Sequence, residues 1–177
     1  MSTAIAFDFD KARFNMIEQQ IRPWDVLDAK VLALLGEVKR EDFVPEAYQP
    51  VALADLEVPL GKGEGQCMLA PKVEARMLQD VAPKPTDKVL EIGAGSGYMA
   101  ALLAHRAQQV ITLEIDPDQA QLARDNLKKA GVYNAEVRTG DGAAKLGQAV
   151  TGSDPLSGPF DVIVLSGSVA EVPPALL

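Results

Sequence analysis

Three glycines stand at alternate positions, Gly93, Gly95 and Gly97, between the apolar run KVLEI and a run of small helix-forming residues. Glycine accepts positive φ angles and lets a ligand come close to the backbone. The N–H groups at the start of the following helix then point at that ligand. A strand, a glycine turn and a helix in this order predict a ligand at the turn, and tight packing of the helix on the strand is the alternative.

Two acidic residues follow the later predicted strands. Glu114 ends the second strand. It follows the glycine turn at close to the ~20-residue offset that is expected of a ribose-binding acid. A carboxylate there can accept from both ribose hydroxyls and would repel a 2′-phosphate. Asp141, in the sequence TGDG, ends the third strand, where it can reach an adenine amino group. Singly, each acid is also explained as a helix cap or a solvated side chain, but together with the glycines they predict one adenosine-bearing ligand.

The spacing of the glycines separates two classes of adenosine ligand. The dinucleotide fingerprint G-x-G-x-x-G requires a glycine at position 98, where this chain has Tyr98. The turn also lacks a lysine or arginine that would meet a pyrophosphate. S-adenosylmethionine fits because it carries adenine, ribose and an amino-acid end but no phosphate. An NAD-dependent enzyme is the alternative, and no metal site is expected.

The elements around these residues alternate between strand and helix. We expect strands at 88–92, 109–115, 135–140 and 158–167, and helices at 97–107 and 116–131. This alternation predicts an α/β, Rossmann-like methyltransferase fold, with a mostly parallel sheet and helices on both faces. Ligands of such sheets bind beyond the carboxyl ends of the strands. The last strand is nearly all apolar, which predicts that both of its faces are covered.

The chain ahead of this pattern is helical and irregular. Residues 10–22 place Phe14, Ile17 and Ile21 at helical spacing, and Pro23 should end or bend this helix. A second helix is expected in the segment that follows, with Asp28 as its cap and Gly36 as its stop.

A third helix, 71–81, begins with proline. Its apolar residues recur at i and i+4: Val73, Met77 and Val81. After the linker 82–87 the strand–helix alternation begins. We therefore expect residues 1–81 to pack on a cofactor-binding core of residues 88–177, with one domain overall.

Composition narrows the function classes. The chain has 177 residues, 47% hydrophobic and 24% charged, with a formal net charge of −8. No apolar run approaches the ~20 residues of a membrane span, and the N-terminus lacks the pattern of a secretory signal. The acidic balance disfavours a nucleic-acid partner, and the single cysteine, Cys67, fits a reducing compartment. We expect a cytoplasmic protein without a membrane partner, and the oligomeric state stays open.

The sequence resembles the protein-L-isoaspartate O-methyltransferase family from about residue 16 to residue 177. The pieces that carry the resemblance are MIEQQIR (16–22), REDFVPEAY (40–48), ALADLEVPLGKGEGQ (52–66), VLEIGAGSGYMAALLA (89–104), GDG (140–142) and PFDVIV (159–164). The family continues with a glycine-rich turn and further strands, so we expect C-terminal strands of the sheet to be missing from this chain.

The resemblance implies S-adenosylmethionine as the methyl donor. It places Glu114 at the ribose and Asp141 and Gly142 at the adenine. The full set of expected cofactor contacts is Met68, Gly93, Gly95, Gly97, Glu114, Ile115, Asp141 and Gly142.

One segment departs from the family pattern. Family members usually read G-Q-T-I-S-Q-P, with hydroxyl residues beside the transferred methyl group, where this chain has Cys67 for the threonine and Leu69 for the serine. An isoaspartyl carboxylate beside leucine would lose its solvent without compensation. We therefore expect altered acceptor specificity, and a non-catalytic S-adenosylmethionine-binding protein is the alternative. The acceptor, a protein or a small molecule, should face Gln66, Cys67, Leu69, Ser166 and Ser168.

Overall fold

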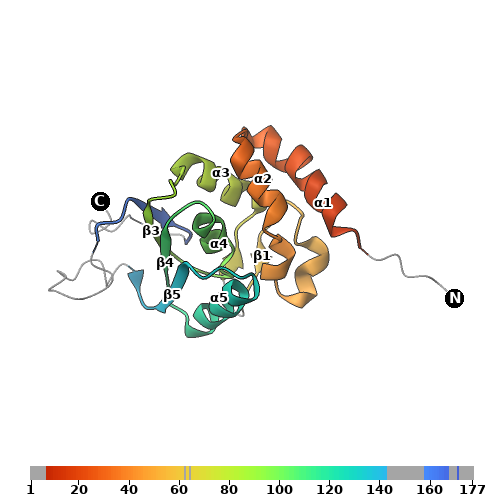
Figure 1. Ribbon diagram of the computed structural model, residues 1–177. Coiled ribbons are helices and arrows are strands. Elements are labelled where there is room, and N and C mark those ends of the chain that lie inside the picture. The colour runs from red at the N-terminus through yellow and green to blue at the C-terminus, as the bar shows by residue number, and fades with distance from the viewer. Residues whose placement is uncertain (1–6, 62, 64, 143–157, 168–170, 172–177) are drawn as a thin grey trace.

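The computed structural model describes residues 7–61, 63, 65–142, 158–167 and 171. Its elements follow one another along the chain as Figure 1 shows. They are α1 (Phe9–Met16), η1 (Ile17–Ile21), η2 (Arg22–Trp24), α2 (Ala29–Glu37), η3 (Arg40–Phe43), η4 (Glu46–Val51), β1 (Val58–Pro59), β2 (Cys67–Met68), α3 (Pro71–Val81), β3 (Lys88–Ile92), α4 (Tyr98–Ala104), β4 (Gln109–Glu114), α5 (Pro117–Lys129), β5 (Ala135–Thr139) and β6 (Val162–Leu165).

The main sheet has the order β5-β4-β3-β6, and all its neighbours are parallel. Because the strands are parallel and in register, their carboxyl ends meet at one edge. Glu91 on β3 pairs with Thr112 on β4 and with Val164 on β6. The predicted parallel α/β architecture is confirmed, and the last strand is shorter than its predicted range.

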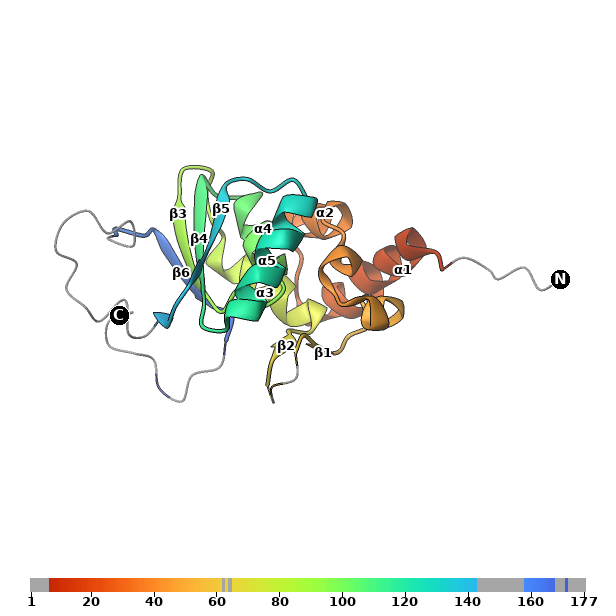
Figure 2. The same cartoon turned by 90° about the horizontal axis from the view of Figure 1, so that it is seen from below.

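The helices α4 and α5 pack on one face of the sheet, and α3 contacts α4 (Figure 2). The opposite face carries a smaller buried cluster of Leu90, Ile111 and Leu113, with Phe160 packed against it. The predicted burial of both faces of β6 is wrong, because Ile163 is 38% exposed. This strand forms the edge of the described sheet.

Helix α4 is buried along its whole length, and each of its 7 residues lies in the core. The helix packs against the sheet and also contacts α3. Its small and apolar side chains allow this close packing. One hydrophobic cluster therefore runs from Ile21 through Leu78 and Leu102 to Val110 on the sheet.

The first helix departs from its predicted pattern. Phe14 is 64% exposed, although it was expected on the apolar face, whereas Met16 and Ile21 are fully buried. The chain continues α1 as a π-helix over η1. A π turn brings residues five apart onto one side, so Met16 and Ile21 share the buried face. The prediction that the helix ends or bends near Pro23 is confirmed by the 3-10 turn η2.

The termini and faces of α2 and α3 test further predictions. Asp28 caps α2 as predicted, but Gly36 does not stop the helix, which continues to Glu37. Helix α3 has its predicted bounds. Met77 and Val81 of the predicted apolar stripe are partly buried and pack against the core, while the most buried residues are Pro71, Glu74, Ala75 and Leu78. None of the described helices is long and apolar enough to cross a membrane.

Candidate functional site

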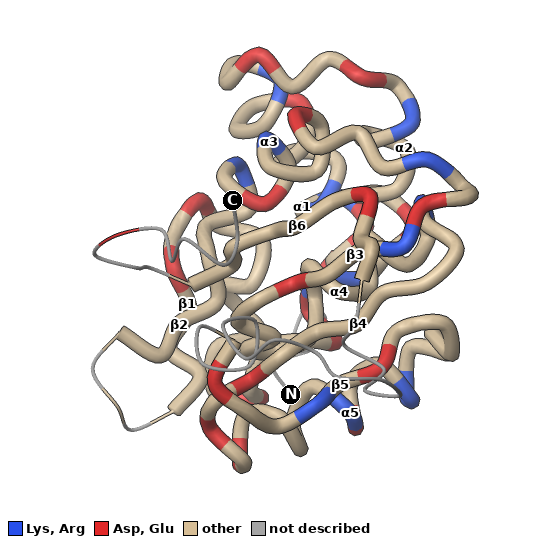
Figure 3. The backbone as a smooth tube through the Cα atoms, turned by 90° about the vertical axis from the view of Figure 1, so that its left-hand side faces the viewer, with Lys and Arg blue, Asp and Glu red and all other residues tan. Residues whose placement is uncertain are grey.

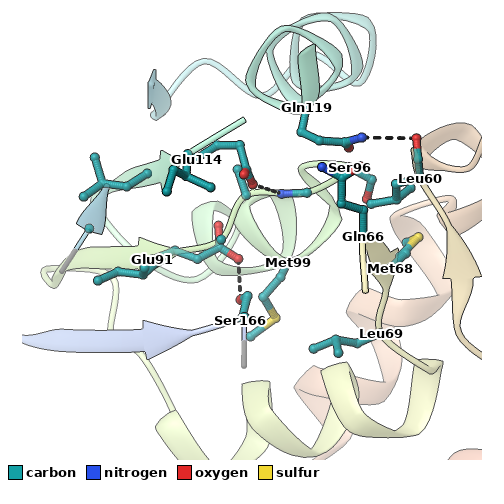
Figure 4. A pocket seen from close by; sticks show the side chains of 18 of the residues that line it. Leu60, Gln66, Met68, Leu69, Glu91, Ser96, Met99, Glu114, Gln119 and Ser166 are labelled. Atoms are coloured by element: carbon teal, nitrogen blue, oxygen red, sulfur yellow. Dashed lines mark hydrogen bonds between the residues drawn. The ribbon is translucent and has the colours of Figure 1, made fainter. Parts of the chain in front are cut away.

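A cavity of about 340 Å³ opens at the carboxyl ends of the parallel strands. Strand ends line it from one side, and the β1–β2 hairpin lines it from the other (Figure 4). The structure brings the following predicted residues together at this cavity: Gln66, Cys67, Met68, Leu69, Gly93, Gly95, Glu114, Ile115, Asp141, Gly142 and Ser166. Ser168, also predicted, lies outside the described residues.

The first two glycines of the turn have positive φ, +96° at Gly93 and +49° at Gly95. A Cβ at Gly93 would lie 3.0 Å from the backbone nitrogen of Gly167, so backbone from β3 and from the end of β6 meets closely there. At Gly95 a Cβ would approach only the side chain of Leu60, at 3.2 Å. Glycine at 95 therefore suits the positive φ of the turn beside the cavity.

The third glycine has a different environment from the one predicted. Gly97 does not line the cavity. Its φ is +85°, and a Cβ there would lie 3.2 Å from the carbonyl oxygen of Ala123 and 3.3 Å from the side chain of Leu127. Close packing of the turn on α5 therefore explains this glycine without a ligand, and its predicted cofactor contact stays a prediction.

Glu114 lies at the junction of β4 and the glycine turn. Its side chain is buried, and Oε2 accepts from the N–H of Gly95 at 2.9 Å, while Oε1 accepts from the N–H of Asp116 at 3.1 Å. An ionised carboxylate has further acceptor sites on each oxygen. The side chain can thus hold the turn and still accept from a ligand in the cavity.

The structure adds Glu91, a buried acid that the sequence analysis left without a role. Ser166 donates a hydrogen bond from Oγ to Oε1 of Glu91 at 2.7 Å (Figure 4). Oε2 of Glu91 has no partner within the described part of the chain. Burial raises the pKa of Glu91 to about 7, against the opposing effect of the hydroxyls of Thr112 and Ser166. The sequence signal was an acid inside the apolar run KVLEI.

The β1–β2 hairpin is tied to the start of α5. Gln66 donates from Nε2 to Oδ2 of Asp116 at 2.7 Å, and Gln119 donates from Nε2 to the carbonyl oxygen of Leu60 at 3.2 Å. The amide oxygen of Gln66 accepts from the N–H of Gly63 at 3.2 Å. Gln66 is therefore engaged by the protein itself, which the sequence could not reveal because Asp116 is 50 positions away along the chain.

Cys67 and Leu69 both line the cavity, as predicted. The Sγ of Cys67 lies 3.5 Å from Oε2 of Glu57. Burial, with Glu57 adding to the effect, raises the pKa of the Cys67 thiol. A thiol of this kind is a poor nucleophile at neutral pH, so Cys67 contributes a small side chain to the cavity wall and not a nucleophile.

The charges of the cavity are of one sign. Four carboxyl residues line it, Glu74, Glu91, Glu114 and Asp141, and no lysine, arginine or histidine does so among the described residues. Figure 3 shows Asp and Glu, in red, along the sheet and at its edge beside β1 and β2. No group of acidic, histidine or cysteine residues suited to a metal occurs in the described ranges. The site therefore suits a ligand with positive charge and no phosphate.

Comparisons with known proteins agree with this geometry. The family model for protein-L-isoaspartate(D-aspartate) O-methyltransferase matches residues 11–177. A protein-L-isoaspartate O-methyltransferase of Koribacter versatilis is 41% identical over 170 residues, which cover 96% of this chain and 71% of that relative. One of Methanoculleus marisnigri is 40% identical over 167 residues, covering 94% of this chain and 71% of the relative.

Solved structures give the same result at the level of the fold. A protein-L-isoaspartate O-methyltransferase structure matches with a TM-score of 0.74 at 25% identity, covering 93% of this chain and 50% of the other. A Plasmodium falciparum structure, described as a protein of this kind in complex with S-adenosyl-L-homocysteine, matches with a TM-score of 0.72. It is 20% identical and is covered to 78% of its length, against 96% of this chain.

Proposed function

The chain belongs to the protein-L-isoaspartate(D-aspartate) O-methyltransferase family, and from this premise we propose that it is an S-adenosylmethionine-dependent methyltransferase with altered acceptor specificity. The observation that carries the proposal is a single cavity. It combines the glycine turn and Glu114 on one side with the apolar Leu69 on the other.

The residues of the cavity fit S-adenosylmethionine, the methyl donor of the family. The unpaired buried oxygen of Glu91 and the excess of carboxyl groups suit a ligand that carries a sulfonium and an ammonium group. Gly93 and Gly95 would face its amino-acid end, Glu114 its ribose, and Asp141 with Gly142 its adenine. When bound, the donor supplies a methyl group that is already activated for displacement.

Most of the catalysis then falls to alignment. Methyl transfer from a sulfonium needs little help from acids or bases, and holding the reactants in line contributes most. Leu69, Met68 and Met99 contribute apolar surface to the cavity, which can orient an acceptor and exclude water. This chemistry does not depend on the hydroxyl residue that Leu69 replaces.

The acceptor is where this chain should differ from its relatives. Two polar side chains of the cavity already donate to the protein itself, since Ser166 donates to Glu91 and Gln66 donates to Asp116. The carbonyl of Leu69 also accepts from Arg40 at 2.7 Å. An acceptor carboxylate would therefore meet an apolar side chain and a cavity lined by carboxyl residues, of which only Glu74 is paired with an arginine, Arg40. This supports an acceptor other than the isoaspartyl group.

Calorimetric titration tests the cofactor. S-adenosylhomocysteine should bind the protein and NAD should not, because the turn offers no cation for a pyrophosphate. Binding of NAD without binding of S-adenosylhomocysteine would contradict the proposal and favour the nicotinamide alternative.

A second assay tests the altered acceptor. With radiolabelled donor and an extract of the source cells, an enzyme should label a component of the extract. Binding of S-adenosylhomocysteine without labelling would favour a non-catalytic binding protein, which the apolar Leu69 also supports. The single cysteine supports a cytoplasmic location as part of the same proposal.

A further inference from the structure

Arg40 is a fully buried arginine that opens the segment REDFVPEAY, and the proposed function gives it no role. Its guanidinium binds three separate parts of the chain. Nε donates to the carbonyl oxygen of Ala52 at 2.8 Å, Nη2 donates to that of Leu69 at 2.7 Å, and Nη1 forms an ion pair with Glu74. The same group lies 5.3 Å from the centre of the Tyr98 ring, at the start of α4.

Two of these partners, Leu69 and Glu74, line the cavity. The wall formed by residues 66–69 has little structure of its own, because β2 has 2 residues and pairs with the equally short β1. The hydrogen bond from Arg40 fixes the last residue of this wall just before α3 begins. Arg40 therefore lies behind the acceptor side of the cavity and joins it to α4.

We propose that Arg40 is a positioning residue, which holds the 66–69 wall, and with it Leu69, in the orientation that faces the acceptor. The inference rests on the proposed function only in naming this wall as the acceptor side. Guanidinium is suited to the task because its planar N–H groups point in fixed directions to several acceptors at once. A lysine at the same position could keep the charge opposite Glu74 but not all three directions.

The chain offers a matched control in a second buried ion pair. Arg13 is 5% exposed and forms an ion pair with Glu41, which is 6% exposed. Neither residue lines the cavity at the strand ends. Arg13→Lys and Arg40→Lys therefore disturb similar buried pairs, and only the second disturbs the wall.

Cys67 provides the readout, because it is the single cysteine and lies in the wall itself. The rate at which 5,5′-dithiobis(2-nitrobenzoate) modifies Cys67 would be measured on the full chain, well below the Tm of each variant. Arg40→Lys should raise the rate about 10-fold, as expected if the loss of one charge-assisted hydrogen bond lets the 66–69 wall move and expose the partly buried Cys67 more often. Arg13→Lys should change it less than about 2-fold, since its effect on stability does not reach the wall.

An unchanged rate in Arg40→Lys, or an equal rise in both variants, would overturn the inference. If Arg40→Lys does not fold, the double variant Arg40→Gln with Glu74→Gln removes both charges together and should show the same faster modification. S-adenosylhomocysteine should protect Cys67 in the wild-type protein. Lack of protection would count against the proposed function, while the contrast between the two arginines would still decide the role of Arg40.

Discussion

The carboxylate of Glu114, at the end of β4, accepts a hydrogen bond from the N–H of Gly95, 2.9 Å away in the turn after β3. Two adjacent strand ends are thus joined by the residue that is also proposed to hold the ribose. Loss of the carboxylate should loosen the turn and remove a ligand contact at once.

Glu114→Gln should weaken S-adenosylhomocysteine binding by about 5- to 100-fold, because an amide cannot accept on both sides as the carboxylate does. Isothermal titration calorimetry gives the Kd directly. Asp118→Asn, an exposed acid in the first turn of α5, is the matched control and should bind as the wild type does. Equal affinity in Glu114→Gln and the wild type would show that Glu114 is not the ribose ligand.

Gly95→Ala should lose affinity for S-adenosylhomocysteine by about 10-fold or more, because a methyl group narrows the approach to the backbone. Gly131→Ala is its control, since Gly131 has a φ of +73° and a Cβ there would meet nothing within 4 Å. Both variants should lose about 1 kcal/mol of stability from the positive φ. If both also bind S-adenosylhomocysteine normally, the turn is a packing feature.

The wild-type protein should methylate isoaspartyl peptides little or not at all. The double variant Cys67→Thr with Leu69→Ser should gain activity, at least about 10-fold, because a hydroxyl can then meet the acceptor carboxylate. Transfer of a radiolabelled methyl group to an isoaspartyl peptide measures both. The double variant should keep its affinity for S-adenosylhomocysteine, which separates an acceptor effect from a cofactor effect. Robust turnover by the wild type would contradict the altered specificity.

Glu91 should make the protein less stable as pH rises. Its pKa in the folded state, about 7, exceeds the ordinary value of 4.5, so between these values the folded protein holds a proton that the unfolded chain has lost. Stability is therefore lost through this window. As pH rises from about 5 to about 7.5, the free energy of unfolding of the wild type should fall relative to that of Glu91→Gln. The difference between the two proteins should change by up to about 3 kcal/mol over this range.

Urea unfolding at several pH values measures this change. The control is Glu136→Gln on β5, because Arg138 lowers the pKa of Glu136 and so gives its pH dependence the opposite sign. A pH-independent difference between Glu91→Gln and the wild type would show that Glu91 is not protonated more readily in the folded state.

The features predicted well from the sequence are those set by local patterns. Helix α3 begins at its proline, and α5 begins at Pro117, directly after its cap Asp116. The glycine turn, Glu114 and Asp141 meet at one edge because parallel strands must end together.

The features that were missed depend on distant partners. The π turn of η1, which places Ile21 on the buried side with Met16, is not encoded in local periodicity. Arg40 reaches acceptors 29 and 34 positions along the chain, so its role is visible only once the fold is formed. The packing of Gly97 against α5 likewise has no local signal in the sequence.

The complete burial of α4 has a consequence for how this enzyme can change. Because the N-terminal segment and one face of the sheet both pack on that helix, they belong to one hydrophobic cluster. Scanning calorimetry should accordingly show one cooperative transition. A substitution in the acceptor wall then changes the stability of the whole chain. A change of acceptor is therefore tolerated only when the substitutions keep α4 buried.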